Sequence, residues 1–473
     1  MAKRIKSIMM MVEEDKDRIS KLPNALIVHI LSFLPTKDVV RTCLLSKRWK
    51  LIWYFVPKLS FSNTESHSQE EFFHFVDKCL EHRKISRNFV PESMVTNFEL
   101  EMKFYDRSLV GCLDKWLAFV VDNKVQEINL CLAPDRSEEN HQIYYYRLPK
   151  TLVINAKYLI NLVLSDVELD SSYSFDFPSL KSLSLHYVRF ADIDVVDKLL
   201  LGSPFLENFQ LCRFQSSYQE DQLCIHSSSL KFLQIKCNTY VPVLIEAVNL
   251  ESLDLFGVSL GKITLSVCKA IKNLVLICVY GTEDSSSLEY LISNLHQLEN
   301  LTLCDLVLLR LKHVKISNHH LKTLKLNCTC SSIDEKEVII EAPKLVSFCY
   351  EGYINHNISI ESSNLLNGIF IFLDHYKKYD AIWFVDMMNF FVNLNCSPKT
   401  VRLDIDSEKA LIFPEKIKKI CRTPLVNWEH LRVFTRSKLE WESELRDALH
   451  WISPSLKSLS IMERAYTSSS STF

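Results

Sequence analysis

The residues whose type and spacing most directly suggest catalysis are a serine between two glycines. The segment Gly257–Gly261 reads G-x-S-x-G, the pattern on which a serine hydrolase presents its nucleophile. That turn must follow a strand and lead into a helix, and a histidine and an acid must follow in the chain. The next residues instead alternate as Ile263, Leu265 and Val267, which predicts a strand. A serine hydrolase using Ser259 is therefore a remote alternative, and both glycines and the serine are expected in a turn.

A second group of residues could bind a metal. His319 and His320 are adjacent, Cys328 and Cys330 follow, and imidazole and thiolate are the ligands that zinc prefers. However, Cys-x-Cys puts both thiols on one face of a strand, and no second pair occurs at zinc-finger spacing. We expect no metal site and no cofactor.

The composition favours a protein that binds other proteins. The 473 residues carry a formal net charge of −2, so no global basic field draws the chain onto nucleic acid or a membrane. Only 7 glycines occur, which argues against nucleotide-binding loops. The 15 cysteines are scattered and contain no C-x-x-C pair, and no signal peptide or membrane span is recognisable. We expect a protein of the cytoplasm, the nucleus or both.

Three short helices are predicted near the N-terminus. Ile27, Ile30, Leu31 and Leu34 follow Pro23 at helical spacing, and Pro35 ends that helix. Thr36 can cap a second helix, and Ser46 can cap a third that carries Trp49, Ile52, Trp53 and Val56. A unit of about 40 residues buries too little surface to be stable alone, so a partner is implied.

These residues resemble the plant-type F-box. The matching segments are Asp17-Arg18-Ile19-Ser20, Leu22-Pro23, Ile30 to Pro35, Thr36 to Thr42 and Leu45-Ser46-Lys47-Arg48-Trp49. The resemblance implies binding to a Skp-family adaptor and, through it, to a cullin. It places the adaptor-binding surface, with its basic rim, at Leu22, Pro23, Ile27, Ile30, Leu31, Leu34, Pro35, Val39, Arg41, Leu44, Leu45, Lys47, Arg48 and Trp49. Some of these apolar residues must instead form the core of the module itself.

A leucine-rich repeat occupies the middle of the chain. The template L-x-x-L-x-L begins at Leu159, Leu180, Leu206, Leu230, Leu250, Ile271, Leu298, Leu321 and Leu345. Weaker copies lie at Val125 and Val95. The second and third apolar positions are two residues apart, so both point inward from a short strand. Stacking such strands gives a parallel sheet along a solenoid with a continuous core. Most copies lack the Asn or Cys that usually follows the strand.

The outward positions of these strands are expected to face a target. They are small, polar and nearly neutral, which suits a protein or peptide. The candidates are Asn161, Asn208, Gln210, Phe232, Gln234, Asp254, Asn273, Asn300 and Lys325. A solvated sheet face is the alternative for any single position.

We therefore expect an α/β protein in which a three-helix F-box at 15–61 precedes leucine-rich repeats at 95–365. A polar junction is predicted from Ser60 to Gln69, so that the two modules can be separated. The repeat period fades in a repeat-like or helical region at 366–465, with a helix at Ala381 to Asn395, and 466–473 is a disordered tail. Irregular repeats of this kind resemble those of plant F-box/LRR-repeat proteins. The resemblance implies a non-enzymatic, substrate-recognition adaptor of an SCF-type (Skp-cullin-F-box) ubiquitin ligase. The alternative is an F-box/LRR protein that binds without causing degradation.

Overall fold

The computed structural model describes residues 19, 21–64, 68–86, 94–105, 107–134, 144–216, 222–237, 241–278, 286–304, 313–329, 337–373, 379–396, 398–419 and 425–464. The chain divides into two compact units, Met1–Gln219 and Glu220–Phe473. The serine-rich tail and Cys330 lie outside the described residues. No described helix is both long enough and apolar enough to cross a bilayer.

The first unit begins with the predicted helices. They are α2 (Asn24–Leu31), α3 (Thr36–Thr42) and α4 (Lys47–Ile52), followed by the 3-10 turn η1 (Trp53–Phe55). Ser46 caps α4 as predicted, because its hydroxyl accepts a hydrogen bond from the Trp49 N–H at 3.4 Å.

Thr36 has a different role from the one predicted. Pro35 occupies the N-cap of α3, and Thr36 is already the first helical residue. Its buried hydroxyl accepts a hydrogen bond from the backbone N–H of Ser60 at 2.8 Å. The side chain therefore joins α3 to the strand that follows the helices.

The polar junction predicted from Ser60 to Gln69 begins instead with part of a strand. Residues Lys58–Ser62 form β1, which pairs in parallel with β2 (Asn97–Tyr105). The parallel sheet continues through β3 (Glu127–Pro134), β5 (Asn161–Ser165), β7 (Ser182–His186) and β9 (Asn208–Cys212). The helical module thus supplies the first strand of the repeat sheet, and no polar linker begins at Ser60.

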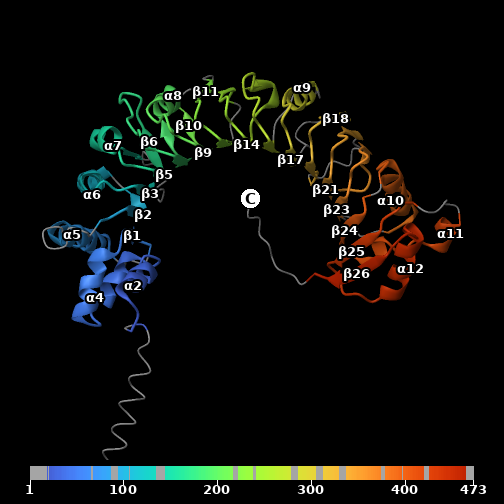
Figure 1. Ribbon diagram of the computed structural model, residues 1–473, viewed down its shortest axis with the longest axis horizontal. Coiled ribbons are helices and arrows are strands. Elements are labelled where there is room, and N and C mark those ends of the chain that lie inside the picture. Colours follow the sequence, from blue (N-terminus) through green and yellow to red (C-terminus); the bar gives the residue numbers. More distant parts are fainter. Residues whose placement is uncertain are drawn as a thin grey trace, which may run out of the picture. The chain divides into compact units, whose positions relative to one another are not determined.

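Helices cover one side of this sheet (Figure 1). They are α5 (Gln69–Ser86), α6 (Val110–Asp122), α7 (Lys150–Asn155) and α8 (Asp194–Leu201), and the 3-10 turn η2 (Arg107–Leu109) precedes α6. A small second sheet lies among the connections and contains β4 (Tyr146–Arg147), β6 (Val167–Leu169), β8 (Arg189–Phe190) and β10 (Gln215–Ser216). The apolar face of the parallel strands is buried beneath these elements.

The second unit continues the same strand pattern. Its parallel strands are β12 (Phe232–Lys236), β14 (Ser252–Phe256), β16 (Asn273–Ile277), β17 (Asn300–Cys304), β19 (Thr323–Asn327), β21 (Ser347–Gly352), β23 (Asn367–Phe372), β24 (Thr400–Ile405), β25 (His430–Thr435) and β26 (Ser458–Glu463). Each described strand pairs in parallel with the next in this order.

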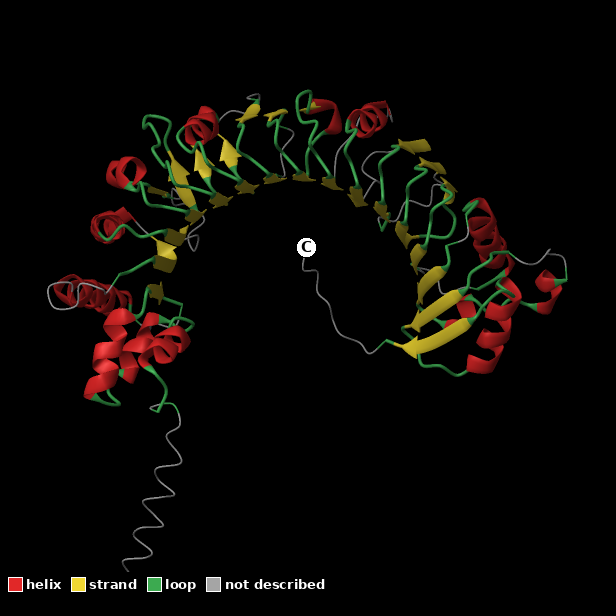
Figure 2. Ribbon diagram, viewed as in Figure 1, coloured by secondary structure: helices red, strands yellow, loops and turns green. Residues whose placement is uncertain are grey.

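Both short sheets and helices cover one face of these strands (Figure 2). The sheets are β11 (Leu223–His226) with β13 (Val243–Glu246) and β15 (Ile263–Thr264), and β18 (His313–Ser317) with β20 (Glu337–Glu341) and β22 (Asn357–Glu361). The helices are α9 (Ser286–Asn294), α10 (Ala381–Asn393), α11 (Glu415–Lys418) and α12 (Glu442–Ile452), and 3-10 turns lie at η3 (Leu260–Lys262) and η5 (Glu408–Ala410).

The repeat template is confirmed. Its first apolar residue lies two positions before each strand, and all nine of these side chains are fully buried, at 0% exposure from Leu159 to Leu345. In several copies the residue after the strand has a left-handed φ, as at Asp166 (57°) and Gly257 (70°). The next position holds the buried Val167 and Val258 instead of a polar ladder residue. Apolar packing therefore replaces side-chain hydrogen bonding on that line of the core.

The region after residue 365, predicted to be repeat-like or helical, continues the sheet through β23 to β26, with strands spaced more widely than before and α10 and α12 between them. The sequence pattern is interrupted because Gly368 stands where the second leucine belongs. A Cβ there would lie 2.9 Å from the Phe370 ring and 3.0 Å from Pro398. The predicted helix at Ala381 is confirmed as α10.

Candidate functional site

Four residues expected on the adaptor-binding surface lie in the core of the N-terminal module instead. Ile27, Leu31, Val39 and Trp49 are between 0% and 5% exposed. Ile52, Trp53 and Val56 are buried as well, so these side chains belong to the apolar core of the module. This corrects their assignment, because a partner cannot reach side chains enclosed in this way.

The other expected apolar residues do reach the surface. Ile30, Leu34, Leu44 and Leu45 are exposed, Leu44 at 89%. Pro23 and Pro35 are exposed as well, and Leu22 is half-buried. Large apolar side chains left in water at this density are typical of an interaction surface.

Sequence reasoning missed two further members of this surface, Leu26 and Phe33, the latter 73% exposed. With Ile30 they recur at i, i+4 and i+7, which is a second helical stripe beside the buried pair Ile27 and Leu31. A helix that is apolar on two sides was the available signal. We call Leu26, Ile30, Phe33, Leu34, Leu44 and Leu45 the exposed apolar set.

All three residues of the expected basic rim are exposed. Lys47 is exposed, and Arg41 forms an exposed ion pair with Asp38 at 2.9 Å. Arg48 instead donates to the carbonyl oxygen of Leu22 at 2.6 Å and to Asn24 Oδ1 at 2.7 Å. Arg48 therefore fastens α4 to the start of α2, and it stays exposed at the expected rim.

A buried arginine attaches the N-terminal module to the first repeat helix. Arg83 of α5 is 2% exposed and donates to the carbonyl oxygens of Trp53 and Val56, both at 2.9 Å. Its guanidinium also lies 5.1 Å from the centre of the Trp53 ring. Burial lowers the pKa of Arg83 to about 10, so the group stays charged at neutral pH.

The surroundings of Ser259 lack the geometry of a nucleophile elbow. Gly257 occupies the recurring left-handed turn after the strand, where its N–H donates to the Ile277 carbonyl oxygen at 3.0 Å. The segment after Ser259 is the three-residue turn η3 and then β15, where an elbow requires a helix. The repeat accounts for the motif.

The candidate metal ligands differ in their exposure to solvent. His319 and His320 are exposed, whereas Cys328 is 2% exposed. Among the residues that the structure describes, no group of three or more His, Cys, Asp or Glu side chains is placed to hold a metal ion.

The candidate target-facing residues all lie on the sheet face opposite the covering helices and short sheets. Asn208 and Asn300 are exposed, and Asn161, Gln210, Phe232, Gln234, Asp254, Asn273 and Lys325 are half-buried. In the second unit they form a ladder across strands. Asn300 donates to Asn273 Oδ1 and Asn273 donates to Ser252 Oγ, both at 2.7 Å.

Asp254 is the one acid among these candidates. Gln234 Nε2 donates to its carboxylate at 3.1 Å, yet burial raises the pKa of Asp254 above its ordinary value. Partial removal of this carboxylate from water therefore outweighs the hydrogen bond from Gln234.

An acidic group at the start of the first unit was also missed. Glu99, Glu101 and Glu127 project from β2 and β3 on the same sheet face. Lys58 pairs with Glu99 at 2.8 Å, and Asn97 donates to Glu127 at 2.5 Å. The earliest repeat copies are weak in sequence, which is why these outward positions were not recognised.

Two family models match the chain. The F-box domain matches residues 19–60. The leucine-rich repeats of the FBD-associated F-box protein At5g56370 match residues 113–272. The two matches follow each other along the chain in the order of the helical module and the repeat sheet.

Several curated proteins of Arabidopsis thaliana are similar to the chain. F-box/FBD/LRR-repeat protein At1g78750 is 34% identical over 228 residues, which cover 45% of each protein. F-box/LRR-repeat protein 13 is 32% identical over 203 residues, covering 42% of each. FBD-associated F-box protein At5g27750 is 31% identical over 259 residues, covering 50% of this chain and 54% of the relative.

The chain thus spans about half the length of the curated relatives it matches. The two family models nevertheless fall on the two structural elements described above, the helical module and the parallel repeat sheet. The chain joins an F-box domain to leucine-rich repeats of the FBD-associated type, and its homologues are F-box/LRR-repeat proteins of Arabidopsis.

Proposed function

We propose that this chain is the substrate-recognition subunit of an SCF-type ubiquitin ligase. The observation that carries the proposal is the exposed apolar set on α2 and on the segments that flank α3. Such side chains are costly to leave in water, and an F-box domain generally binds a Skp-type adaptor.

The energetic argument rests on the most exposed members of that set. Burying a leucine or phenylalanine side chain contributes about 1.5–3 kcal/mol. Leu44, Leu45 and Phe33 are each more than 60% exposed, so each has most of that free energy to gain at an interface. The core formed by Ile27, Leu31, Val39 and Trp49 holds these side chains in place beforehand, which reduces the entropy lost on binding.

In this proposal the repeats bind the target and the chain performs no bond-making step. A polar ladder such as Asn300, Asn273 and Ser252 offers amide and hydroxyl groups to a protein or peptide. Holding that target beside the ubiquitin-carrying subunits accelerates transfer through proximity. The proposed partners are a Skp-family adaptor, a cullin reached through it, and a protein target in the cytoplasm or nucleus.

Co-purification of the full chain with a Skp-family adaptor and a cullin tests the proposal. We expect all three to elute as one complex, and failure to bind the adaptor would overturn the assignment. The half-life of a captured target then separates the two adaptor roles. A longer half-life when this chain is depleted supports ubiquitin-dependent degradation, whereas an unchanged half-life supports binding without degradation.

A further inference from the structure

The last strand of the second unit differs from its neighbours in how well its apolar residues are covered. In β25, the core residues Leu431 and Val433 are at most 1% exposed. In β26, the equivalent Leu459 and Ile461 are only half-buried. β26 is also the end of its sheet, and no described strand pairs with its outer edge. The described part of the chain therefore leaves one side of this strand uncovered.

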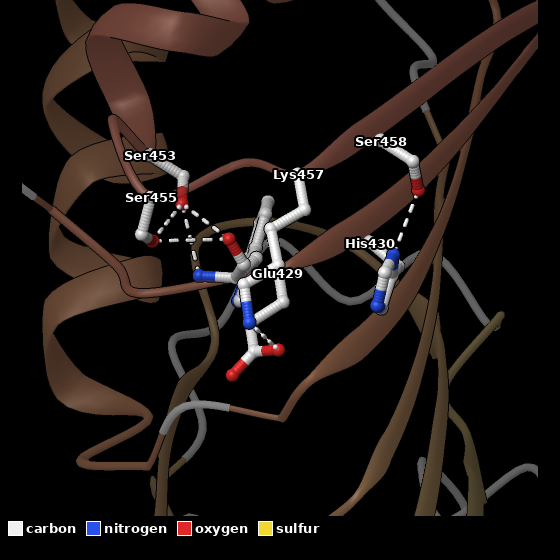
Figure 3. A network of polar contacts seen from close by, with 7 residues as sticks. Glu429, His430, Ser453, Ser455, Lys457 and Ser458 are labelled. Carbon is white, nitrogen blue, oxygen red and sulfur yellow. Dashed lines mark hydrogen bonds and ion pairs between the residues drawn. The ribbon is translucent and has the colours of Figure 1, made fainter.

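β26 is nevertheless firmly held on its inner side (Figure 3). Lys457 Nζ lies 2.7 Å from Glu429 Oε2, and His430 Nδ1 lies 2.8 Å from Ser458 Oγ. Just before the strand, the Ser453 hydroxyl accepts from the Trp428 N–H at 2.9 Å and donates to the Trp428 carbonyl oxygen at 3.1 Å. The uncovered edge is thus an ordered strand with a fixed register.

The pairing with β25 determines which backbone groups face outward. Just before the strand, the N–H of Lys457 donates to the carbonyl oxygen of Glu429 at 2.7 Å. From Ser458 onward the even-numbered residues bond inward, since the N–H of Ser458 also donates to Glu429 and that of Arg464 donates to Thr435. In a parallel ladder the alternate residues point the other way. The N–H and C=O groups of Leu459, Ile461 and Glu463 therefore line the outer edge, where an added strand could bond to them.

We infer that this edge pairs with β26 of a second copy of the chain, antiparallel and centred on Ser460. This register places Leu459 opposite Ile461 of the other copy, and both residues have outward backbone groups, as a hydrogen-bonded antiparallel pair requires. It also places Lys457 opposite Glu463. By two-fold symmetry, each of these pairs forms twice.

The order of side chains favours this register over its neighbours. Lys457, Leu459, Ile461 and Glu463 lie on one face of the strand and read basic, apolar, apolar, acidic. In the antiparallel pair the second copy runs in the opposite direction, so each charged side chain lies opposite one of opposite charge and each apolar side chain lies opposite an apolar one. A shift by two residues would set Lys457 against Ile461 or Glu463 against Leu459. This self-complementarity favours a second copy as the partner of the edge. An unrelated strand could bond to the outward backbone groups but would lack the matching side chains.

The test is sedimentation of the purified full chain over a wide range of concentrations, into the micromolar. We expect a reversible monomer–dimer equilibrium. E463K should weaken it about tenfold or more, because both opposite-charge pairs between the copies become like-charge pairs. K457E reverses the same pairs and also removes the Lys457–Glu429 pair within each copy, so it should weaken the dimer at least as much. An equimolar mixture should restore a heterodimer, because one variant then carries only acids at this edge and the other only bases.

A backbone variant provides an independent test. Ile461→Pro removes an N–H that points to the outer edge, and proline is tolerated at such a position of an edge strand. We expect loss of the dimer with little change in the thermal unfolding of the monomer. Ser460→Ala is the matched control and should still dimerise. A monomer at every concentration, a dimer that survives Ile461→Pro, or a charge-swapped mixture that does not associate would each overturn the inference.

Discussion

The hydroxyl oxygen of Thr36 accepts a hydrogen bond from the backbone N–H of Ser60 at 2.8 Å. A side chain from the second F-box helix thereby satisfies a backbone group on the first strand of the repeat sheet. The edge of a sheet is normally exposed to chance pairing, and here the F-box covers it. The F-box and the first repeats consequently form one folded body within the first unit.

Removing that acceptor should destabilise the protein. Thr36→Val keeps the shape of the side chain but leaves the Ser60 N–H without its partner, at a cost of about 1–3 kcal/mol. Chemical denaturation monitored by circular dichroism measures the change. Thr36→Ser keeps the hydroxyl and serves as the control. Equal stability of the valine and serine variants would show that the bond contributes nothing.

Substituting Arg83 should lower the free energy of unfolding more than substituting Thr36. Arg83→Met leaves the carbonyl oxygens of Trp53 and Val56 without their charged donor, and we expect a loss of about 3 kcal/mol in the free energy of unfolding. Arg41→Met is the matched control, because its exposed ion pair with Asp38 contributes at most about 1 kcal/mol. Similar losses in the two variants would contradict the assigned role of Arg83.

Adaptor binding and folding should respond to different leucines and isoleucines. Leu44→Ala with Leu45→Ala should weaken adaptor binding by about 2–4 kcal/mol, roughly 30- to 1000-fold, without lowering the melting temperature. Leu201→Ala with Phe205→Ala is the control, since these side chains are 71% and 63% exposed but lie outside the F-box. Calorimetric titration with the purified adaptor measures the affinity. Unchanged affinity in the first variant would mean that the exposed apolar set is not the docking surface.

Ile27→Ala should weaken adaptor binding only by destabilising the fold of the F-box. Its side chain is fully buried, so truncation should lower the free energy of unfolding by about 2–5 kcal/mol. Any loss of adaptor binding in this variant would then accompany partial unfolding, which thermal denaturation detects. A stable Ile27→Ala protein that no longer binds the adaptor would instead make Ile27 a contact residue.

Asp254 should make stability depend on pH. Its pKa in the folded chain is raised by burial, so the carboxylate is harder to ionise there than in the unfolded chain. Its contribution is fully present below the pKa of the unfolded chain and is lost as pH rises through the folded value. Asp254→Asn should therefore raise the melting temperature at neutral pH and leave it unchanged in acid. Parallel melting curves at the two pH values check this, and an equal shift at both would exclude ionisation as the cause.

The sequence predicted the elements that depend on periodic apolar residues. The three N-terminal helices and every strand from β5 to β21 in the repeat sheet lie where the spacing of leucines placed them. It did not predict β1, because a five-residue strand reads like a polar junction until its partner is known. Gly368 concealed the continuation of the repeats, since the space needed by the Phe370 ring overrides the leucine pattern. Helical spacing also could not separate Ile27 from Ile30, because burial depends on how the helices pack.

The placement of β1 also bears on how the protein is made. The chain leaves the ribosome from its N-terminus, and β2 begins at Asn97, 35 residues after Ser62 ends β1. Because translation adds about 5–20 residues per second, β2 is synthesised a few seconds after β1, with which it pairs. Arg83 likewise emerges after the carbonyl groups that it binds. A nascent chain stalled before β2 would therefore leave Phe61 without its contact to Phe98, and the F-box should become fully structured only once the first repeat has been synthesised.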